Sequence, residues 1–423
     1  MEQKIFTELR PLYATSKKNP NTMRIRIRMR DLIEQNALRN AVDTTMKRYP
    51  YFCVELQKKE GQYIFAENHR PIVISNSIQG VELNSEESNF HMIAFCRYNN
   101  VIILDIFHGL TDGAGAYEIV RTLLYYYCSL RYNVELAKDG IKLNGDKISA
   151  EEWVDPVYNS ENLPAPKRLD MPKPFDPLEN AKLRDDNVNT VFSVALSESE
   201  FIQFNKNNGG SPGTMVSLFL SRAIVKLYPD AADPVRVILC VNQRKALHAP
   251  LAHQSLVGGA YLEFKKEMHT WPLSEQAKAY RNMVSDQAQE EAVLAGVHSQ
   301  KGIYQMLLSM ETEQERISLA EQVGNMTSRI ITASVSYVGK ANYGDAEKYI
   351  RDFHLWTAPP AYNAILIEIS AVNGRFILDI IQPFSSPIFV NAFLRELEDN
   401  NINYDLQDVS DLYLPNIRLP WTT

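Results

Sequence analysis

The segment FHGLTDG, residues 107–113, joins the end of an apolar run to the start of an amphipathic one. Apart from Asp105, residues 101–107 are apolar and rich in β-branched side chains, which is typical of a strand buried on most of its faces. From residue 114 to about 130, apolar residues recur at the spacing of a helix. His108 therefore lies at the end of a predicted strand, where a rigid backbone can present its ring to a cleft as a general base.

In a chain with eight histidines, a histidine followed four residues later by an aspartate can easily occur by chance. Taken without its surroundings, the pair is more often accidental than catalytic. The preceding strand, the glycines at 113 and 115, and the following helix favour a catalytic role. This strand-turn-helix context makes His108 the candidate catalytic residue.

Length and composition are those of a compact globular protein. The 423 residues exceed what one hydrophobic core usually supports, so we expect two lobes, and 45% hydrophobic residues supply their cores. The net charge of −7 argues against nucleic acid as a partner, because that affinity rests on lysines and arginines paired with phosphates. No segment has the apolar run of a signal peptide or a transmembrane helix, so the sequence predicts a cytoplasmic location.

Two further patterns bear on binding. Residues 24–30, RIRIRMR, alternate charged and apolar side chains, which predicts a strand at a sheet edge with one wet face; its arginines could also serve an anionic ligand such as a phosphate. The four cysteines are widely spaced in apolar surroundings and are expected to be buried thiols in a reduced compartment. Because no Cys-x-x-Cys or His-x-x-x-His pair occurs, the sequence predicts no metal site.

The order of elements divides the chain into a lobe at residues 1–180 and a second lobe at 181–423. A proline-rich segment at 156–177 provides the crossover between them. Strands and helices alternate without a regular βα period, which excludes a Rossmann or barrel fold and predicts an α/β (α+β) fold with mixed sheets. In the second lobe we expect helices around 273–295 and 303–323, strands near 331–338, 363–371 and 375–381, and a tight hairpin at Asn373-Gly374.

These residues resemble the superfamily of CoA-dependent acyltransferases, which includes chloramphenicol acetyltransferase, alcohol acetyltransferases, the plant BAHD acyltransferases and the condensation domains of nonribosomal peptide synthetases. Its signature, His-x-x-x-Asp-Gly, is matched by His108, Asp112 and Gly113. The resemblance covers most of the chain, with further similarity, in the same order, at RYPYF (48–52), VNQR (241–244), SVSYVG (334–339) and the final hairpin and helix.

The resemblance implies two similar chloramphenicol-acetyltransferase-like lobes, each a mixed sheet with helices, around an active-site tunnel. Acyl-CoA would enter from one side as cosubstrate, with no cofactor bound permanently, and a small alcohol or amine acceptor from the other. His108 would take the acceptor's proton without forming an acyl-enzyme. Asp112 would have a structural role with an arginine, for which we predict Arg244, after the predicted strand at 235–241. The candidate substrate-binding residues are Asn242, Ser334, Ser336 and Tyr337; the two serines could stabilise the oxyanion, although serines in strands are more often surface residues.

Two departures from the family pattern narrow the prediction. Phe107 stands where condensation domains carry the first of two histidines, and the Asp-Phe-Gly-Trp-Gly motif of BAHD enzymes is absent. The sequence therefore favours a free-standing alcohol acetyltransferase-like enzyme, an O- or N-acyltransferase that uses acyl-CoA, with acetyl as the expected acyl group. The alternatives are a condensation-like protein that takes its acyl group from an acyl-carrier protein, and a non-catalytic binding protein on the same fold.

Three other features are predicted to be structural. The run Tyr125-Tyr126-Tyr127 is expected to pack in the core rather than line a tunnel. His248 and His253 are expected to be surface histidines in a loop. Trp356, near Pro359-Pro360, is expected in an ordered loop that could act as a lid.

Overall fold

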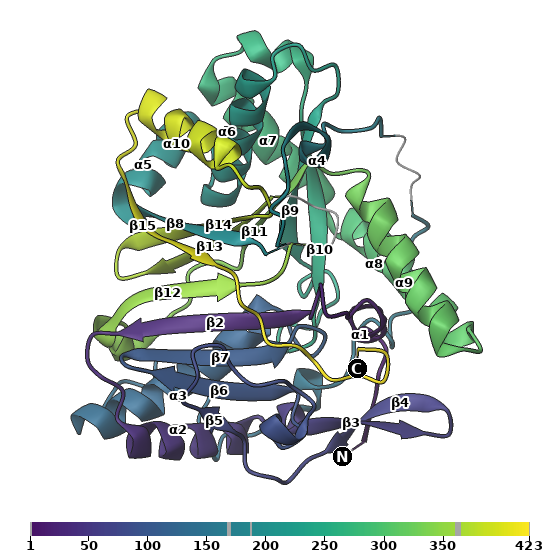
Figure 1. Cartoon of the computed structure of the whole chain (residues 1–423), viewed down its shortest axis with the longest axis vertical. Helices are drawn as coiled ribbons and strands as arrows, with labels where there is room; N and C mark the ends of the chain where they lie inside the picture. The colour runs from purple at the N-terminus through teal and green to yellow at the C-terminus, as the bar shows by residue number, and fades with distance from the viewer. Residues whose placement is uncertain (1, 167–170, 187, 360–364, 423) are drawn as a thin grey trace.

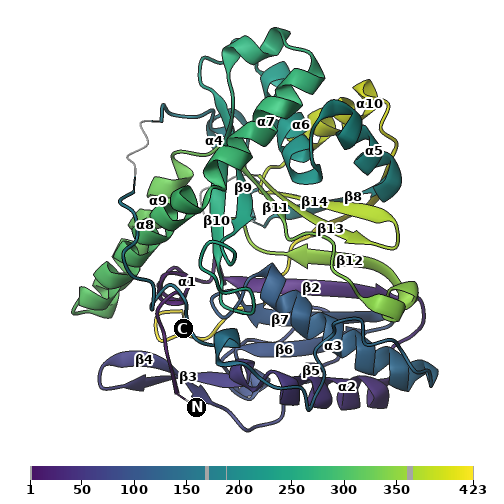
Figure 2. The ribbon, with the colours of Figure 1, turned by 180° about the vertical axis from the view of Figure 1, so that it is seen from behind.

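The structure is a computed structural model that describes residues 2–166, 171–186, 188–359 and 365–422. Two lobes lie one above the other in Figures 1 and 2. We call them the lower and the upper lobe after their positions in Figure 1. Each lobe has its own main sheet and helices, as the α/β prediction requires. No helix within the described residues combines the length and the apolar composition that crossing a membrane requires.

The lower lobe contains a five-stranded sheet of order β12-β2-β7-β6-β5. The helices α2 (Gln35–Arg48) and α3 (Gly113–Tyr132) pack against one face of it. Its strands are β12 (Ile350–Trp356), β2 (Thr22–Met29), β7 (Val101–Phe107), β6 (Ile93–Tyr98) and β5 (Ile74–Ser75). Beside them lie a three-stranded sheet, β1 (Glu2–Lys4), β4 (Gln62–Glu67) and β3 (Val54–Lys59), and the short helix α1 (Leu9–Tyr13).

The upper lobe contains a seven-stranded sheet of order β10-β9-β11-β13-β14-β8-β15, covered on the side away from the lower lobe by helices (Figure 1). The strands are β10 (Val257–Phe264), β9 (Val235–Asn242), β11 (Ala333–Tyr337), β13 (Leu366–Val372), β14 (Arg375–Gln382), β8 (Thr190–Ser197) and β15 (Tyr404–Asp411). The helices are α4 (Pro177–Asn180), α5 (Glu198–Asn208), α6 (Pro212–Leu227), α7 (Leu273–Gln287) and α10 (Ile388–Asp399).

The helices α8 (Glu290–Ser309) and α9 (Glu313–Ser328) form a hairpin beside both sheets (Figures 1 and 2). Both contact α1, and Tyr304 and Leu307 of α8 belong to the core of the lower lobe. Short 3-10 helices complete the described elements: η1 (Pro50–Phe52), η2 (Glu86–Ser88), η3 (Ala150–Glu152), η4 (Lys266–Thr270) and η5 (Gly344–Tyr349).

Two segments of the second half of the chain return to the lower lobe. Strand β12 pairs antiparallel with β2, so that Trp356 lies opposite Arg24. Near the C-terminus, Ile417 forms a bridge with Leu83, and the Trp421 ring stacks on Tyr13 with 5.2 Å between the centroids. The lobe boundary near residue 180 stays a prediction, and segments cross between the lobes on its C-terminal side.

A buried ion pair joins β12 to the upper sheet. Nδ1 of His354 lies 2.9 Å from Oδ2 of Asp379 on β14, and Nε2 lies 3.3 Å from Oδ1 of Asp352 on β12. Burial alone would lower the pKa of His354, but the two carboxylates raise it to about 9. The imidazolium form of His354 is therefore held between the two sheets.

The structure corrects the predicted sheet edge at residues 24–30. Strand β2 lies between β12 and β7, because a strand from far along the sequence covers its outer side. Arg24 is buried, and its guanidinium binds both oxygens of Asp105 and two backbone carbonyls, so it is not free for an anionic ligand.

Two further expectations are corrected in the same way. Trp356 ends strand β12 and is buried, so it is not part of a loop; Pro360, in the predicted lid, lies outside the described residues. The predicted helices at 273–295 and 303–323 are three helices, α7, α8 and α9. Helix α7 stops at Gln287, whose amide binds both backbone groups of Tyr261 on β10, a tertiary contact that helical periodicity does not reveal.

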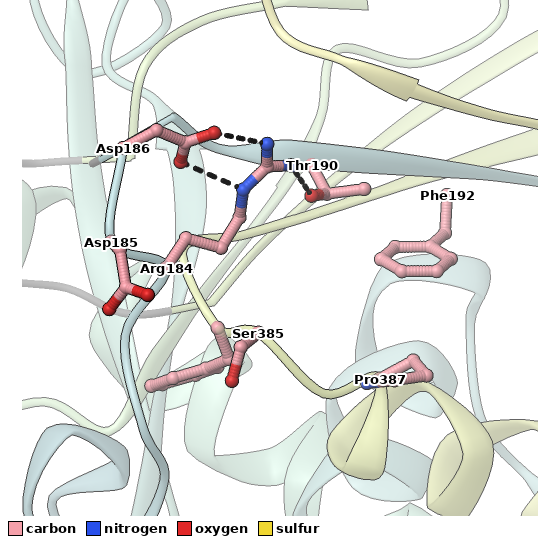
Figure 3. A pocket seen from close by; sticks show the side chains of 8 residues that line it. Arg184, Asp185, Asp186, Thr190, Phe192, Ser385 and Pro387 are labelled. Carbon is pink, nitrogen blue, oxygen red and sulfur yellow. Dashed lines mark hydrogen bonds and ion pairs between the residues drawn. The ribbon is translucent and has the colours of Figure 1, made fainter.

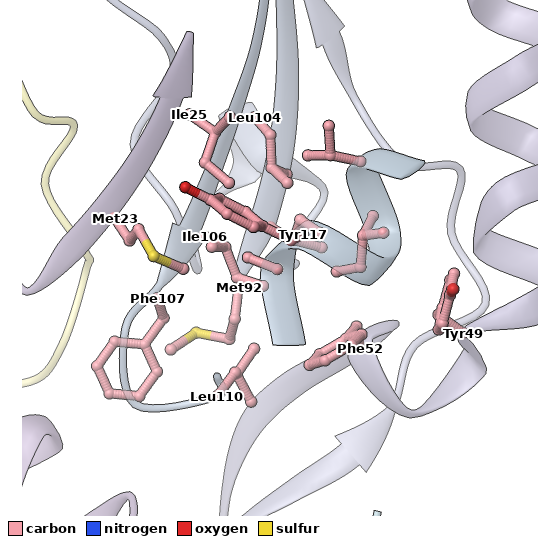
Figure 4. Packing of buried hydrophobic residues seen from close by; sticks show 14 of the residues in the cluster. Met23, Ile25, Tyr49, Phe52, Met92, Leu104, Ile106, Phe107, Leu110 and Tyr117 are labelled. Carbon is pink, nitrogen blue, oxygen red and sulfur yellow. The ribbon is translucent and has the colours of Figure 1, made fainter. Parts of the chain in front are cut away.

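The core of the lower lobe fixes the turn that carries His108. Phe107 and Leu110, on either side of it, are 0% and 5% exposed. Figure 4 shows both side chains among the buried residues of β2, β7 and α3, with Met92 close to them. Tyr127 of the tyrosine run is also buried in this core, while Tyr125 and Tyr126 pack against it. The backbone of the turn is thus anchored by packing.

Candidate active site

His108 follows directly after β7 and is half-buried. Its backbone N–H donates to the carbonyl of Asn21, at 2.8 Å. Its Nδ1 lies 3.0 Å from the carbonyl oxygen of Thr111. Because a carbonyl only accepts, this contact places the proton on Nδ1 of the neutral ring and leaves the lone pair of Nε2 free. The ring is thereby oriented as a base that acts through Nε2.

Asp112 caps the N-terminus of α3 and uses both carboxylate oxygens for structural bonds. Oδ1 accepts from the N–H of Gly115 at 3.1 Å, and Oδ2 accepts from the N–H of Leu256 at 3.0 Å. Arg244 donates to both oxygens at 2.8 Å. The carboxylate therefore joins the His108 turn to the loop after β9, and none of its contacts is to His108.

Arg244 organises that loop beyond its pair with Asp112. Its guanidinium also donates to the carbonyls of Ala252 and Gln254, at 2.7 and 2.9 Å. The side-chain oxygen of Asn242 accepts from the backbone N–H of Arg244 at 2.9 Å. Two of the residues predicted for the site, Asn242 and Arg244, thus lie together as supports of the loop facing Asp112.

Two glycines allow the turn to pack against the upper lobe. A Cβ on Gly113 would lie 2.5 Å from Cγ2 of Val338, just beyond β11. A Cβ on Gly115 would lie 2.7 Å from the carbonyl oxygen of His253, and closer still to the hydroxyl of Thr111. Real Cβ atoms do not tolerate such distances, so glycine is required here for close approach.

The RYPYF segment supports the site through a buried network. Arg48 makes two 2.9 Å hydrogen bonds to Glu152, and the hydroxyl of Tyr51 donates to the same carboxylate at 2.9 Å. Burial raises the pKa of Glu152, but the hydrogen bonds from Arg48, Ser149 and Tyr51 outweigh it and set the pKa at about 2. Glu152 is therefore an anion that anchors the neighbouring loop, a role that sequence reasoning missed.

His253 belongs to the same network, and the prediction of a surface histidine is wrong for it. Its side chain is 3% exposed, its ring stacks on Phe52 with 5.8 Å between centroids, and its Nδ1 lies 3.0 Å from the hydroxyl of Tyr51. Burial lowers the pKa of His253 to about 3, so the ring is neutral. His248, by contrast, is exposed as predicted.

A polar row on the upper sheet faces the lower lobe. On β11 and β13, Val335, Ile367 and Ile369 pack toward the helices, so the intervening residues point the other way. Ser336 and Glu368 are opposite one another on these strands, and Thr357 donates to Oε1 of Glu368 at 2.8 Å.

Glu368 lies within electrostatic reach of His108. Burial has the largest effect and leaves the pKa of this carboxyl group raised above its ordinary value, although hydrogen bonds from Ser336 and Thr357, and the charge that His108 carries when protonated, oppose the increase. Sequence reasoning missed Glu368. The available signal was a lone carboxylate in the otherwise apolar segment LIEISAV, residues 366–372.

The remaining candidates divide between the two faces of β11. Ser334 is 5% exposed and lies on the same face as Ser336, two residues earlier. Tyr337 points toward the helices, where its ring packs edge-on against Phe376 at 5.9 Å. The structure thus brings Ser334 and Ser336 to the face turned to the lower lobe and leaves Tyr337 out of it.

Two cavities of similar volume lie in different parts of the protein. One, of about 440 Å³, lies beside α1 and reaches Gln254 of the loop that Arg244 holds. The other, of about 460 Å³, is in the upper lobe between β8 and the start of α10 (Figure 3). Arg184, which lines it, already binds Asp186, Thr190 and Asp411, so the described residues of this second cavity offer no free cation.

Comparison with solved structures identifies the fold. Polyketide synthase associated protein 5 from Mycobacterium tuberculosis aligns with a TM-score of 0.60 at 14% identity, over 94% of this chain and 98% of that one. TRI101 of F. sporotrichioides, solved with coenzyme A and T-2, aligns with a TM-score of 0.61 at 11% identity, over 95% and 99% of the two chains. The condensation domain of the Monacolin K polyketide synthase MokA aligns with a TM-score of 0.61 at 12% identity, over 94% and 97%.

No protein-family model matches the sequence, and no curated protein matches it either. The structural likenesses nevertheless extend over nearly the whole of each chain. They confirm the resemblance stated from the sequence at the level of the fold: this chain has the two-lobe, chloramphenicol-acetyltransferase-like fold that TRI101 and the condensation domains have.

Proposed function

We propose that this protein is an acyltransferase that moves an acyl group, which we expect to be acetyl, from CoA to a hydroxyl or amine of a small acceptor. His108 is the general base. The observation that carries the proposal is the bond from Nδ1 of His108 to the Thr111 carbonyl, which leaves Nε2 basic. The TRI101 structure with coenzyme A and T-2, on the same fold, supports CoA as the donor.

In the proposed reaction, Nε2 of His108 removes the acceptor's proton as the acceptor oxygen or nitrogen attacks the thioester carbonyl. The tetrahedral intermediate then collapses, the C–S bond breaks, and the sulfur takes the proton back from Nε2 to give free CoA thiol. No acyl-enzyme forms, and one histidine serves both steps. A positioned base contributes on the order of 10²–10⁴ in rate, and holding both substrates in register supplies more.

Asp112 and Arg244 have a positioning role in this proposal. Their ion pair fixes the start of α3 against the loop after β9, which keeps the His108 turn in one conformation. Glu368, when ionised, would stabilise the imidazolium that forms during proton transfer. The proposal includes a cytoplasmic location for the protein.

A second candidate donor is the thioester of an acyl-carrier protein. It is favoured by the alignment with the MokA condensation domain, which covers 94% of this chain. The residue before His108 is a buried phenylalanine, Phe107, whereas condensation domains carry the first of two histidines at this position. For this reason we place CoA first and the carrier protein second.

Thiol release from acetyl-CoA and longer acyl-CoAs, with pooled alcohols and amines, tests the proposal. We expect acceptor-dependent release that falls at least about 100-fold in His108→Ala, as loss of a general base predicts. His248→Ala, which removes an exposed histidine, serves as the matched control and should leave the rate unchanged.

Full activity of His108→Ala would refute His108 as the base. Absence of release in every pool would refute CoA as the donor and direct the same assay to acyl-carrier thioesters. If neither donor is used, the protein is a binding protein on this fold.

A further inference from the structure

The cavity beside α1 is enclosed by segments that lie far apart in the sequence. It is lined by the N-terminal segment, by β4, by the loop after η3 and by the α8–α9 hairpin. Figure 1 shows α1, β4 and this hairpin at the same side of the molecule. Its volume is about 440 Å³, which is in the range of small-molecule sites. Aromatic side chains dominate its apolar walls: Phe6, Tyr13, Tyr63, Trp153 and Tyr158.

Two carboxyl groups line this cavity without forming an ion pair to a described residue. Glu8 is 7% exposed and accepts the N–H of Phe6 at 3.0 Å. Asp155 accepts the N–H groups of Thr7, Val157 and Tyr158 at 3.1, 2.8 and 3.1 Å. Within the described residues, neither group has an ion-pair partner. Arg316 also lines the cavity, but its guanidinium is bound to the carbonyls of Leu307 and Met310.

Gln254 provides an independent sign of a missing ligand. Its side chain is 6% exposed and lines the cavity, and its Oε1 is buried without a hydrogen-bond partner among the described residues. A buried amide oxygen left unsatisfied costs roughly 1–3 kcal/mol, so a donor from a bound molecule would relieve it. Gln254 is also tied to the candidate active site, because its carbonyl accepts from Arg244.

We infer that this cavity binds the cationic nitrogen of the acceptor, an amine held by Gln254, Glu8 and Asp155 within an aromatic enclosure. An ammonium or guanidinium group supplies an N–H donor for Oε1 of Gln254 and a positive charge beside the two carboxyl groups, and aromatic faces attract it further. Burial raises the pKa of both Glu8 and Asp155, and the neighbouring Asp155 raises that of Glu8 further, so a bound cation would favour their ionised forms. The phosphates of CoA would meet two carboxyl groups here, so this side of the protein fits the acceptor rather than the donor.

The inference rests on the proposed function in assigning this ligand as the acceptor. An ammonium held by carboxylates is protonated and so is not a nucleophile. The acceptor is therefore a compound with two functional groups: a cationic nitrogen that anchors it in the cavity and a separate hydroxyl or amine that reaches His108.

Binding can be measured without catalysis, because Trp153 lines the cavity. Tryptophan fluorescence of the full-length protein is titrated with phenethylamine and with 2-phenylethanol, which share a skeleton and differ in the cationic group. We expect the amine to bind at least about tenfold more tightly than the alcohol, in wild type and in His108→Ala alike. Loss of the signal in Trp153→Phe assigns the signal to this cavity.

Two variants and a control test the named contacts. Glu8→Gln should weaken amine binding about tenfold or more. The side chain of Gln254 makes no hydrogen bond to another described residue, so Gln254→Leu should fold normally and also weaken amine binding. Glu161→Gln removes the charge of an exposed carboxylate outside the cavity and should change nothing. Equal binding of amine and alcohol, or unchanged amine binding in Gln254→Leu, overturns the inference.

Transfer assays separate this inference from the proposed function. Acetyl-CoA is offered with 6-aminohexan-1-ol and with hexan-1-ol, and we expect the amino alcohol to have the lower KM, with Gln254→Leu removing most of the difference. Equal KM values would refute the anchoring site while leaving the acyltransferase intact. Tight amine binding without any transfer would refute the acyltransferase while leaving the amine site intact.

Discussion

Asp112 is the residue whose contacts best explain the stability of the site. It is 2% exposed, and it accepts hydrogen bonds from Gly115, Leu256 and both terminal nitrogens of Arg244. A buried ion pair contributes little relative to a well-packed apolar pair, but removing one partner leaves the other charge buried and unpaired. The contribution of Asp112 to stability should therefore show mainly in variants that remove its charge and leave Arg244 buried and unpaired.

Asp112→Asn keeps the shape of the side chain and removes its charge. We expect the free energy of unfolding, measured by urea denaturation at pH 7, to fall by about 3 kcal/mol or more. The matched control is Asp43→Asn, which breaks an exposed i,i+4 pair with Arg39 and should cost no more than about 0.5 kcal/mol. Similar losses in the two variants would show that the Asp112 pair has no special structural role.

Spacing within one segment is what made His108, Asp112 and Gly113 predictable, because strand, turn and helix follow one another locally. For Arg244, the family resemblance implied that Asp112 pairs with an arginine, and the predicted buried strand before Arg244 pointed to this residue. Glu152 could not be singled out, because its partner Arg48 is brought to it only by tertiary packing. For Glu368 the apolar segment around it was a signal, but its contact with Thr357 also depends on tertiary packing.

The start of α3 is the element whose position depends most on the absence of a side chain. A Cβ on Gly113 would contact Val338, whereas a Cβ on Gly296, in the exposed part of α8, would meet nothing within 4 Å. Gly113→Ala should therefore destabilise the protein by about 1–3 kcal/mol through overpacking. Gly296→Ala should stabilise it by about 0.5–1 kcal/mol, because alanine favours the helix. Thermal unfolding of both variants checks the opposite signs; equal signs would contradict the packing argument.

The strand β12 gives the protein a pH-dependent link between its sheets. His354 has a pKa of about 9 in the folded state, above the ordinary value of 6.5. Its contribution to stability is therefore fully present below pH 6.5 and is lost as the pH rises through 9. The charged groups that face it are Asp379 and Asp352, with Arg26 and Arg28 on the neighbouring strand.

Urea denaturation of wild type and His354→Gln across pH 6 to 9.5 measures this contribution. We expect the difference in unfolding free energy between the two proteins to shrink as the pH rises. His248→Gln, at an exposed histidine, should show no such trend. A constant difference between wild type and His354→Gln would show that the charge of His354 does not stabilise the fold.

Most elements of the fold follow from local patterns, but their partners do not. The Asn373-Gly374 hairpin was predicted from two residues that adopt positive φ, 47° and 72°, and β13 and β14 pair across it as expected. The strands β10 and β12 were not predicted. The sequence HLW at 354–356 carries no alternation that distinguishes a strand from a loop, and β12 is stabilised by pairing with β2.

At the scale of the whole molecule, the exchange of segments predicts that the lobes unfold together. Strand β12 completes the lower sheet, and the segment near the C-terminus packs on Tyr13 and Leu83. Two variants that keep only Trp271, in the upper lobe, or only Trp421, in the lower, report on each lobe separately. We expect coincident urea transitions, as for a single cooperative unit. Midpoints separated by more than about 0.5 M would show independent lobes.

The position of β12 in the lower sheet also affects how the protein can be made. During synthesis β2 emerges from the ribosome early, whereas β12 (Ile350–Trp356), which covers its outer side, emerges only after most of the upper lobe. Throughout that interval the nascent chain presents an uncovered strand edge that also carries the arginines of β2, and such edges pair readily with other chains. The rate at which synthesis proceeds from Arg30 to Trp356 therefore sets how long a newly made chain stays open to aggregation.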